Sequence, residues 1–436
     1  MARLAFFSPL PPAATGIADY SVDVLQILAS CHVIDVFHDQ EAVDATGLPP
    51  SCRIYRSQEF EERQSLRRYD LAIYQMGNGA AHAFLYPLVA RRPGLLVLHD
   101  LVLHHSRART FLESAEALAY SRDPSNAALR EAALTQLERY HEEVGYSYPQ
   151  QARRLASAQL ETVGELLPYA YPLFRLPVEA SRATAVHNGF MARAIREELP
   201  GAAIARVTMP MARVPVAPDA IARLRARHGI AADEIVVGSF GLLTREKQID
   251  VVARAAARAV ALGTRLRLLL VGPLPDAATL WARLTELGLR DAAILTGRVP
   301  LAELPVYVEA TDIVVHLRYP TARETSAALL RVLAQGRPTV MSDLENLAEI
   351  PHDAVVRADV TDEEGDVLRS ILRLAAAPGE RERLGRSAAS FVARQHSAER
   401  CLATYQAAIE AAIGAEPSAS RASWPSHWPR PDREAS

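Results

Sequence analysis

The 436-residue sequence predicts an α/β protein with two doubly wound parallel sheets in series. Short apolar runs of strand length alternate with helix-period segments in both halves, the pattern of parallel sheets covered by helices. A proline-punctuated stretch separates the two series. The length and the 49% apolar content are sufficient for two or three domains with full cores.

The first series predicts an N-terminal domain of residues 1–208 with a helical insertion. Helix-period segments such as Ile17–Ala29 lie between several of its strands. From Arg107 to Leu167 the sequence is strand-free and rich in Ala, Leu, Glu and Arg, which predicts the insertion. The strands predicted here are Leu4–Phe7, His32–Phe37, Leu71–Gln75, Leu95–His99 and Ala183–His187.

The second series predicts a C-terminal domain of residues 219–395. The stretch 209–218 contains three prolines and no clear period, so it is the predicted linker. A helix is expected at 396–414, and the composition of 415–436 predicts a disordered tail. The tail's two tryptophans, Trp424 and Trp428, leave docking on a partner as an alternative. The strands predicted here are Ile235–Phe240, Leu266–Val271, Ala293–Leu295, Ile313–His316 and Thr339–Met341.

Composition excludes several classes of protein. The net charge is -3 and the arginines are spread along the chain, so the sequence does not predict a nucleic-acid partner. No apolar run approaches the length of a membrane span, and the apolar stretch at the N-terminus is too short for a secretory signal. The three cysteines lack metal-ligand spacing and indicate free thiols. We therefore expect a cytoplasmic protein.

Lys247 is the single lysine among the 48 lysine and arginine residues. It follows an apolar strand and a glycine turn, at the start of a helix. An ammonium is a compact charge with three donors, whereas a guanidinium is a wide planar fork. Near helix amides, such a charge suits a phosphate. The alternative is a surface lysine at a helix start.

Ligands of open α/β sheets bind beyond the carboxyl ends of the strands. In the first such loop, Gly16 permits close approach of the backbone to a ligand, although the loop lacks a GxGxxG motif. His99 ends a strand and is a candidate substrate contact, or alternatively a core histidine. His104 and His105 are expected at the surface, because no cysteine or carboxylate pattern supports a metal site.

A third loop, in Leu317–Asp343, carries Glu324, Thr325 and Ser326 before a predicted helix. Thr325 or Ser326 would cap that helix and leave its free amides toward the loop, an arrangement that binds phosphate. An ordinary capped helix with a surface glutamate is the alternative. Together with Lys247, the loop favours a phosphate site.

These residues resemble the retaining family 4 glycosyltransferases, which have two Rossmann-like domains facing a cleft, the GT-B fold. The family's G-R-L-x-x-E-K-G segment is matched by Gly241–Gln248, with Lys247 at the phosphate-binding lysine. Leu266–Pro273 is similar to the strand and turn beside the nucleotide. Val299 falls at the base-contacting position, and Gly16 and His99 fall at the glycine loop and the sugar-contacting histidine.

The sequence departs from the family pattern at two places. The family's phosphate-binding arginine falls on Leu242, with Arg245 nearby in the loop. Of the paired glutamates, E-x7-E, Glu324 takes the first place if one residue is deleted, and the second falls on Arg331. A guanidinium cannot accept the ribose hydroxyl protons, so either the donor binds differently there or Arg331 reaches a phosphate.

The resemblance implies transfer of a sugar from a nucleoside-diphosphate donor to an acceptor hydroxyl with retention of configuration, in glycan or glycolipid synthesis. Catalytic roles fall on Lys247, Glu324 and His99. The diphosphate would be bound by Gly16, Lys247, Arg245, Thr325 and Ser326, and the nucleotide by Val299 and Arg331. No cofactor is expected, and no D-x-D pair indicates a metal.

The acceptor would be a glycan or a lipid-linked molecule that meets the N-terminal domain near Gly16 and the insertion. A lipid-linked acceptor would place the protein at the inner face of the membrane, through peripheral contact of the insertion. Two other classes stay open. A non-catalytic scaffold would bind sugar nucleotides without turnover, and a nucleotide-sugar epimerase would convert the donor with no acceptor.

Overall fold

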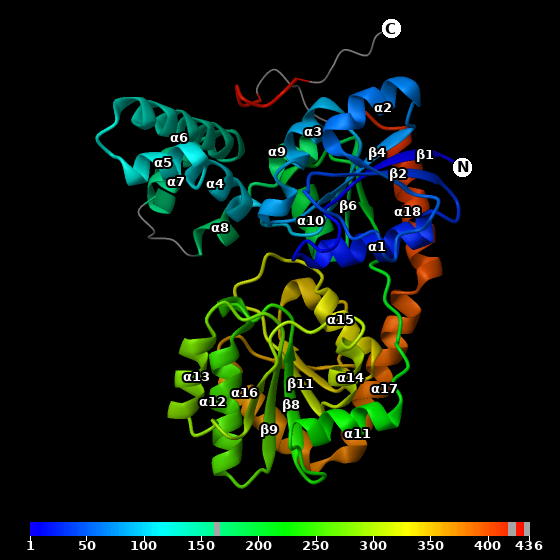
Figure 1. Cartoon of the computed structure of the whole chain (residues 1–436), viewed down its shortest axis with the longest axis vertical. Helices are drawn as coiled ribbons and strands as arrows, with labels where there is room; N and C mark the ends of the chain where they lie inside the picture. Colours follow the sequence, from blue (N-terminus) through cyan, green and yellow to red (C-terminus); the bar gives the residue numbers. More distant parts are fainter. Residues whose placement is uncertain (161–165, 417–423, 431–436) are drawn as a thin grey trace. The chain divides into compact units, whose positions relative to one another are not determined.

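The computed structural model describes residues 1–160, 166–416 and 424–430. It has two compact units, drawn in Figure 1. Unit 1 consists of Met1–Pro210, Ala322–Thr325 and Ala398–Ser436, and unit 2 of Met211–Thr321 and Ser326–Ser397. Each unit has its own parallel sheet and its own core.

The sheet of unit 1 has seven strands in the order β3-β2-β1-β4-β5-β6-β7. All neighbouring strands are parallel. The strand order reverses between β1 and β4, which makes the carboxyl ends of these strands a switch point. The strands are β1 (Arg3–Phe7), β2 (Val33–His38), β3 (Arg53–Arg56), β4 (Leu71–Met76), β5 (Leu95–Leu98), β6 (Ala183–Val186) and β7 (Ile204–Arg206).

Helices follow most strands of unit 1 and pack on its sheet, and the last helix, α18, packs against β4, β5, β6 and β7. Aromatic side chains fill much of the core, where Phe7 stacks on Phe37 and Tyr74. The helices are α1 (Gly16–Leu28), α2 (Phe60–Leu66), α3 (Leu85–Arg91), α4 (His104–Leu112), α5 (Ala115–Arg122), α6 (Ala127–Ser147), α7 (Ala152–Leu160), α8 (Leu167–Ala170), α9 (Arg175–Ala180), α10 (Gly189–Glu198) and α18 (Ala398–Ile413), with short 3-10 turns η1 (Ser57–Glu59) and η2 (Ala80–His82).

The sheet of unit 2 has six strands in the order β10-β9-β8-β11-β12-β13. Every neighbouring pair is again parallel. The order reverses between β8 and β11, so the switch point of this sheet lies at their carboxyl ends. The strands are β8 (Ile235–Phe240), β9 (Leu266–Val271), β10 (Ala293–Leu295), β11 (Ile313–His316), β12 (Thr339–Ser342) and β13 (Val356–Ala358).

Both faces of the unit 2 sheet are buried. Along β8, Val236 and Phe240 enter one core and Val237 the other, because successive side chains of a strand point to opposite faces. Helices α12, α13 and α16 cover one face, and α11 and α14 cover the other (Figure 1). The helices are α11 (Pro218–Arg227), α12 (Ile249–Ala261), α13 (Ala277–Glu286), α14 (Leu304–Glu309), α15 (Ala327–Ala334), α16 (Glu363–Ala376) and α17 (Pro378–Gln395), with 3-10 turns η3 (Arg245–Lys247) and η4 (Glu345–Leu347).

The predicted fold class is confirmed: two Rossmann-like units, with a helical insertion in the first. The sequence did not predict three strands, β3, β7 and β13. Each of them is an edge strand of three or four residues, and none is fully buried. Such strands lack the apolar run by which a buried strand is recognised.

The units do not follow the predicted boundaries in every detail. The predicted C-terminal helix, α18, belongs to unit 1 although it follows unit 2 in the sequence. Within the predicted linker 209–218, unit 2 begins at Met211, whose amide donates to the carbonyl of His396. The amide of Val214 likewise donates to the side chain of Gln335.

Between β5 and β6 the described residues contain no strand, and the helices α4 to α8 form the predicted insertion. It has a small apolar core of its own, in which Phe111 of α4 meets Tyr140 and Val144 of α6. His104 was expected at the surface. It is buried instead, with Nδ1 at the carbonyl of Tyr171 and Nε2 at the hydroxyl of Tyr140.

The prediction of a disordered tail is wrong for residues 424–430, which we call the C-terminal segment. Trp424 and Trp428 are each only 4% exposed and belong to the core of unit 1. Their aromatic surface supplies the burial that the rest of the tail composition lacks. The other parts of the predicted tail that fall on 417–423 and 431–436 lie outside the described residues.

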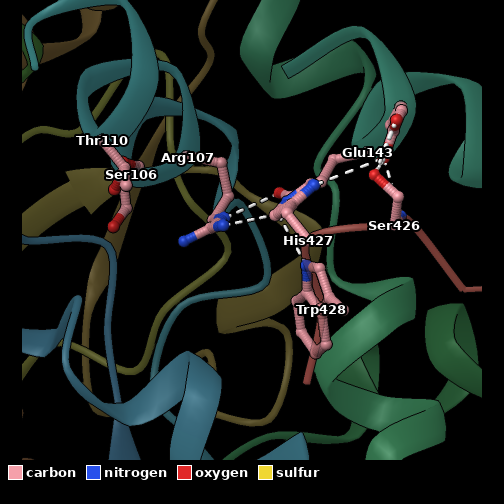
Figure 2. Close-up of polar contacts among 8 residues, drawn as sticks. Ser106, Arg107, Thr110, Glu143, Ser426, His427 and Trp428 are labelled. Carbon is pink, nitrogen blue, oxygen red and sulfur yellow. Dashed lines mark hydrogen bonds and ion pairs between the residues drawn. The ribbon is translucent and has the colours of Figure 1, made fainter. Parts of the chain in front are cut away.

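The C-terminal segment is fixed to α6 by polar contacts (Figure 2). Glu143 pairs with Arg107 of α4, with Nε donating to Oε2 at 2.7 Å and Nη2 to Oε1 at 2.5 Å. Trp428 Nε1 donates to Oε1 of the same carboxylate at 2.7 Å, and His427 Nε2 lies 3.0 Å from it. Ser426 donates its amide and its hydroxyl to Glu142.

The charge pair of Arg107 and Glu143 is buried, with side-chain exposures of 6% and 3%. The guanidinium also lies over the ring of Tyr86, with Cζ 4.0 Å from the ring centre. Burial alone would raise the pKa of Glu143, but the charge and hydrogen bonds of Arg107, followed by His427 and Trp428, lower it to about 2. The C-terminal segment therefore completes the hydrogen bonding of a buried carboxylate, which a buried charge requires.

Candidate functional site

The loop after β8 turns sharply at Gly241, whose φ is +107°. It lies against the loop after β9, where Gly272 has a φ of +140°. A Cβ on Gly272 would stand 1.8 Å from the carbonyl oxygen of Gly241. Only glycine permits this approach of two backbones, which holds the two strand-end loops together at the carboxyl edge of the sheet.

Lys247 ends the 3-10 turn η3 after this loop and is only 6% exposed. The next residue, Gln248, adopts a left-handed conformation and is the N-cap of α12. The Nζ of Lys247 lies 3.4 Å from both ring nitrogens of His316, the last residue of β11. The predicted surface alternative for Lys247 is therefore excluded, because the side chain is buried at the switch point of the unit 2 sheet.

The first turn of α15 and the ammonium of Lys247 both lie near Gly241. A Cβ built on Gly241 would stand 3.8 Å from Lys247 Nζ and 3.6 Å from the Cβ of Ala328, in the first turn of α15. Ser326 caps this helix, and its hydroxyl accepts from the amide of Leu329 at 3.3 Å. Gly241 thus lies close to both a buried ammonium and the first turn of α15, and an ammonium and a helix N-terminus both attract anions.

Unit 2 also contains three other predicted site residues. Arg245 is exposed, two residues before Lys247 in η3. Val299 is partly buried against the core that α11 and α14 cover. Arg331 is partly exposed in the last turn of α15, so it does not share the helix N-terminus with Ser326.

Gly16 is the first residue of α1 in unit 1, and Thr15 caps that helix. A Cβ built on Gly16 would meet no atom within 4 Å. The fold of unit 1 therefore does not require glycine here. The close approach of a ligand to the first turn of α1 stays a prediction.

His99 lies in a buried polar network of unit 1 and is 5% exposed. Its Nε2 lies 2.8 Å from Gln75 Oε1, and its Nδ1 lies 3.2 Å from Nε2 of His187. Burial first, then His187 and His82, hold the pKa of His99 well below its usual range, so the ring is neutral. Since both ring nitrogens have protein partners, the geometry favours the core-histidine interpretation that the sequence left open.

Glu324 and Thr325 are grouped with unit 1, in the short stretch Ala322–Thr325. The side-chain amide of Asn188 donates to Thr325 Oγ1 at 3.1 Å and to the carbonyl of Arg323 at 3.0 Å. Arg323 adopts a left-handed conformation with φ of +64°, an uncommon state for a residue with a side chain. Thr325 is thus engaged by Asn188, and Ser326 is the residue that caps α15.

Three residues of these arrangements were missed in the sequence. The sequence identified His316 only as the last residue of a predicted strand. It did not show that β11 lies next to β8, which is what brings His316 to Lys247. Asn188 follows a predicted strand and caps α10, so its position after an apolar run was an available signal. Gly272 had the same signal, in the turn directly after β9.

Solved glycosyltransferase structures are similar to nearly the whole chain. Sucrose-phosphate synthase from Thermosynechococcus elongatus is 18% identical, with a TM-score of 0.64, and the match covers 93% of this chain and 98% of that one. The Anabaena protein HepE, solved with UDP and glucose, is 14% identical, with a TM-score of 0.64 and coverage of 94% and 100%. This chain has the GT-B fold.

A family model matches a region of this GT-B chain that lies mostly in unit 2. Residues 234–376 match the family model described as Glycosyl transferases group 1. The 2-deoxystreptamine glucosyltransferase of Streptomyces kanamyceticus is 27% identical over 138 residues, which are 31% of this chain. The match spans 35% of that relative, about a third of its length.

Two features are absent from the described residues of the GT-B chain. In the part that the structure describes, no group of three or more histidine, cysteine, aspartate or glutamate side chains is placed to hold a metal ion. None of the described helices combines the length and apolar character needed to cross a bilayer.

Proposed function

We propose that this GT-B protein is a retaining glycosyltransferase that moves a sugar from a nucleoside-diphosphate donor to an acceptor hydroxyl. One observation carries the proposal: Lys247, the single lysine of the chain, is buried at the switch point of unit 2, close to Gly241, which also lies near the first turn of α15. The matched region 234–376 contains this whole arrangement. Ligands of open α/β sheets bind at such switch points.

The chemistry follows from the charge that develops on the leaving group. The bond between the anomeric carbon and the diphosphate oxygen breaks, and its electron pair leaves with the diphosphate. The acceptor oxygen forms the new bond on the same face of the sugar, and its proton passes to the departing diphosphate. Lys247 and the first amides of α15 would stabilise the departing diphosphate. Fixed donors of this kind are usually the largest contribution to catalysis.

The remaining predicted roles belong to the same proposal. Arg245 is exposed and would reach the outer phosphate, and Ser326 orients the α15 amides that bind it. Glu324 would orient the donor sugar, and Thr325, which accepts from Asn188, would position that loop. In unit 1, Gly16 would admit the ligand to the first amides of α1. Because its ring nitrogens are engaged, His99 would act by holding Gln75 and His187 in place.

The donor is proposed to be a sugar nucleotide whose base lies near Val299. HepE was solved with UDP and glucose, and the Streptomyces relative is a glucosyltransferase, so UDP-glucose is the first donor to test. Arg331 stands where the family has its ribose-binding carboxylate, and a guanidinium can only donate. We infer that Arg331 contacts a phosphate or an acceptor atom of the base. The acceptor is proposed to be a glycan or lipid-linked molecule, reached in the cytoplasm or at the inner membrane face.

The test compares Lys247→Ala and Lys247→Arg with the unchanged protein in assays with UDP-, GDP- and ADP-glucose. We expect Lys247→Ala to lose at least about a hundredfold in turnover, as when one preorganised donor is removed. Lys247→Arg keeps the charge but should lose at least about tenfold, because a planar guanidinium directs its donors differently from a compact ammonium. Near-normal turnover of Lys247→Ala, with unchanged melting, would refute the assignment.

The single lysine gives a second measurement. An amine-reactive reagent can modify only Lys247 and the N-terminal amine, so mass spectrometry reports on this one side chain. We expect a bound nucleoside diphosphate to slow the modification of Lys247 and to leave the N-terminal amine unaffected. Equal modification with and without saturating UDP, GDP and ADP would show that Lys247 does not contact the diphosphate.

Arg331 and Leu242 also suit a protein that binds sugar nucleotides without turnover. Leu242 is 53% exposed and offers no charge where the family has an arginine. The same assays separate this scaffold from the transferase, because a scaffold would protect Lys247 from modification without consuming any donor. An epimerase would give a changed sugar nucleotide with no acceptor present.

A further inference from the structure

A buried histidine contacts the ammonium of Lys247 and has no role in the chemistry described so far. His316 is the last residue of β11, is 3% exposed, and lies in the strand next to β8. Among the described residues, its ring nitrogens have no hydrogen-bond partner apart from Lys247. A buried imidazole normally bonds to a carbonyl or a carboxylate, so its side-chain surroundings here are unusual.

The two distances define where the ammonium lies on the ring. Lys247 Nζ is 3.4 Å from Nδ1 and 3.4 Å from Nε2. In the plane of an imidazole, a cation at this distance from both nitrogens would collide with Cε1, which lies between them. The ammonium therefore lies over the face of the ring, in a cation–π arrangement.

The charge states make this contact favourable. Burial first, then the charges of Lys247 and Arg318, hold the pKa of His316 well below its usual range, so the ring is neutral. A neutral aromatic face attracts a cation without forming a directional bond to its hydrogens. The contact with the ring face therefore does not need the N–H groups of the ammonium to point at a ring nitrogen.

From this geometry we propose that His316 is a positioning residue that fixes the ammonium of Lys247 toward the diphosphate of the donor. The inference rests on the proposed function, because it assigns the role of His316 at the same site. A flexible four-carbon side chain has many rotamers, and the aromatic face removes that freedom in advance of binding. Gly241 also lies close to the ammonium, since a Cβ on it would stand 3.8 Å from Nζ.

The test replaces His316 with two apolar residues that differ in one property. Phenylalanine keeps an aromatic face, whereas leucine fills the strand end without one. The ligand is whichever of UDP, GDP and ADP binds the unchanged protein most tightly. We expect its affinity, measured by calorimetry, to fall by about tenfold in His316→Leu, the size of effect of a desolvated cation–π contact. Binding of the corresponding nucleoside should not change. His316→Phe should stay within about threefold of the unchanged protein.

A spectroscopic measurement tests the contact without any ligand. Lysine labelled with 13C at Cε gives one side-chain methylene signal, because the chain has one lysine. A ring face shifts the protons beside it upfield, so this signal should move downfield in His316→Leu and stay upfield in His316→Phe. A merely structural role of His316 would not distinguish the two variants in this way. If His316→Leu fails to fold, His316→Gln takes its place, since its amide is planar but not aromatic.

The outcomes separate the two proposals. Absence of nucleoside-diphosphate binding in the unchanged protein would overturn the proposed function. Diphosphate binding that is lost in Lys247→Ala but equal in His316→Leu and His316→Phe, with equal methylene shifts, would overturn the role of His316 alone.

Discussion

Replacing Glu143 with glutamine tests how the C-terminal segment stabilises unit 1. Glutamine keeps the size of the side chain and removes its charge, which leaves the buried guanidinium of Arg107 without a counter-charge. The pKa of Glu143 is lowered from 4.5 to about 2. Each pH unit between the folded and unfolded pKa is worth about 1.4 kcal/mol, so the ionised carboxylate contributes about 3 kcal/mol at neutral pH. Loss of one partner of a buried pair costs a similar amount, about 3–5 kcal/mol.

The sign of the pH dependence follows from the direction of the shift. The folded state lowers the pKa, so the stabilisation is complete above the unfolded value of 4.5 and is lost as the pH falls toward about 2. The difference in unfolding free energy between the unchanged protein and Glu143→Gln should therefore be constant near neutral pH. Below pH 4.5 it should decrease.

Urea unfolding followed by tryptophan fluorescence measures the free energy of unfolding at the C-terminal segment itself. The chain has three tryptophans, of which Trp424 and Trp428 are in the C-terminal segment. A Trp281→Phe background removes the third, in unit 2, so the signal then reports the C-terminal segment alone.

Glu142→Gln is the matched control. Glu142 is half-exposed and bonds Ser426, so its replacement should cost less than about 1 kcal/mol. Equal midpoints for the two variants, or a Glu143→Gln effect unchanged from pH 7 to pH 3, would refute the reasoning.

Two further predictions concern the stability of unit 2 and of unit 1. Gly272→Ala should destabilise unit 2 by at least about 3 kcal/mol, because its Cβ would collide with the Gly241 carbonyl. Gly263→Ala, also at positive φ but with no atom within 4 Å of its Cβ, should cost only about 1–2 kcal/mol, and similar thermal unfolding of the two variants would count against the collision. Tyr405→Phe should destabilise unit 1 by about 1–2 kcal/mol in urea, because the hydroxyl bonds Tyr20 and Gln75 in a buried network. An unchanged unfolding midpoint would show that these groups find other partners.

The central strands could be predicted from the sequence because each is a short, uninterrupted apolar run. The predicted Ile235–Phe240 and Leu266–Val271 match β8 and β9 residue for residue. The edge strand β13 (Val356–Ala358) could not be recognised, since one side of an edge strand has no neighbour and its residues need not be apolar; the edge strand β10 (Ala293–Leu295) was recognised because its residues are all apolar. The C-terminal segment was wrongly predicted to be disordered because the composition of residues 415–436 was taken as a whole, which hides the contribution of single residues. Two tryptophans can dock even where the surrounding residues cannot form a core.

The candidate site was only partly visible for a different reason. The composition singled out Lys247, and the glycine turn before it predicted a loop at the end of a strand. Its neighbour His316 is 69 residues away in the chain, and the two meet because β11 lies beside β8 in the sheet. Single-sequence patterns do not give strand order, so a lone histidine at a strand end could not be distinguished from an ordinary core residue.

The membership of α18 and the C-terminal segment in unit 1 has a consequence for biosynthesis. Ribosomes make the chain from its amino end, so the first 210 residues emerge long before the helix that packs on their sheet. Most of unit 2 is one continuous stretch between these parts and can fold while translation continues. The first-made half is therefore the last to be completed, and a nascent chain stalled before Ala398 would expose the apolar surface that α18 covers.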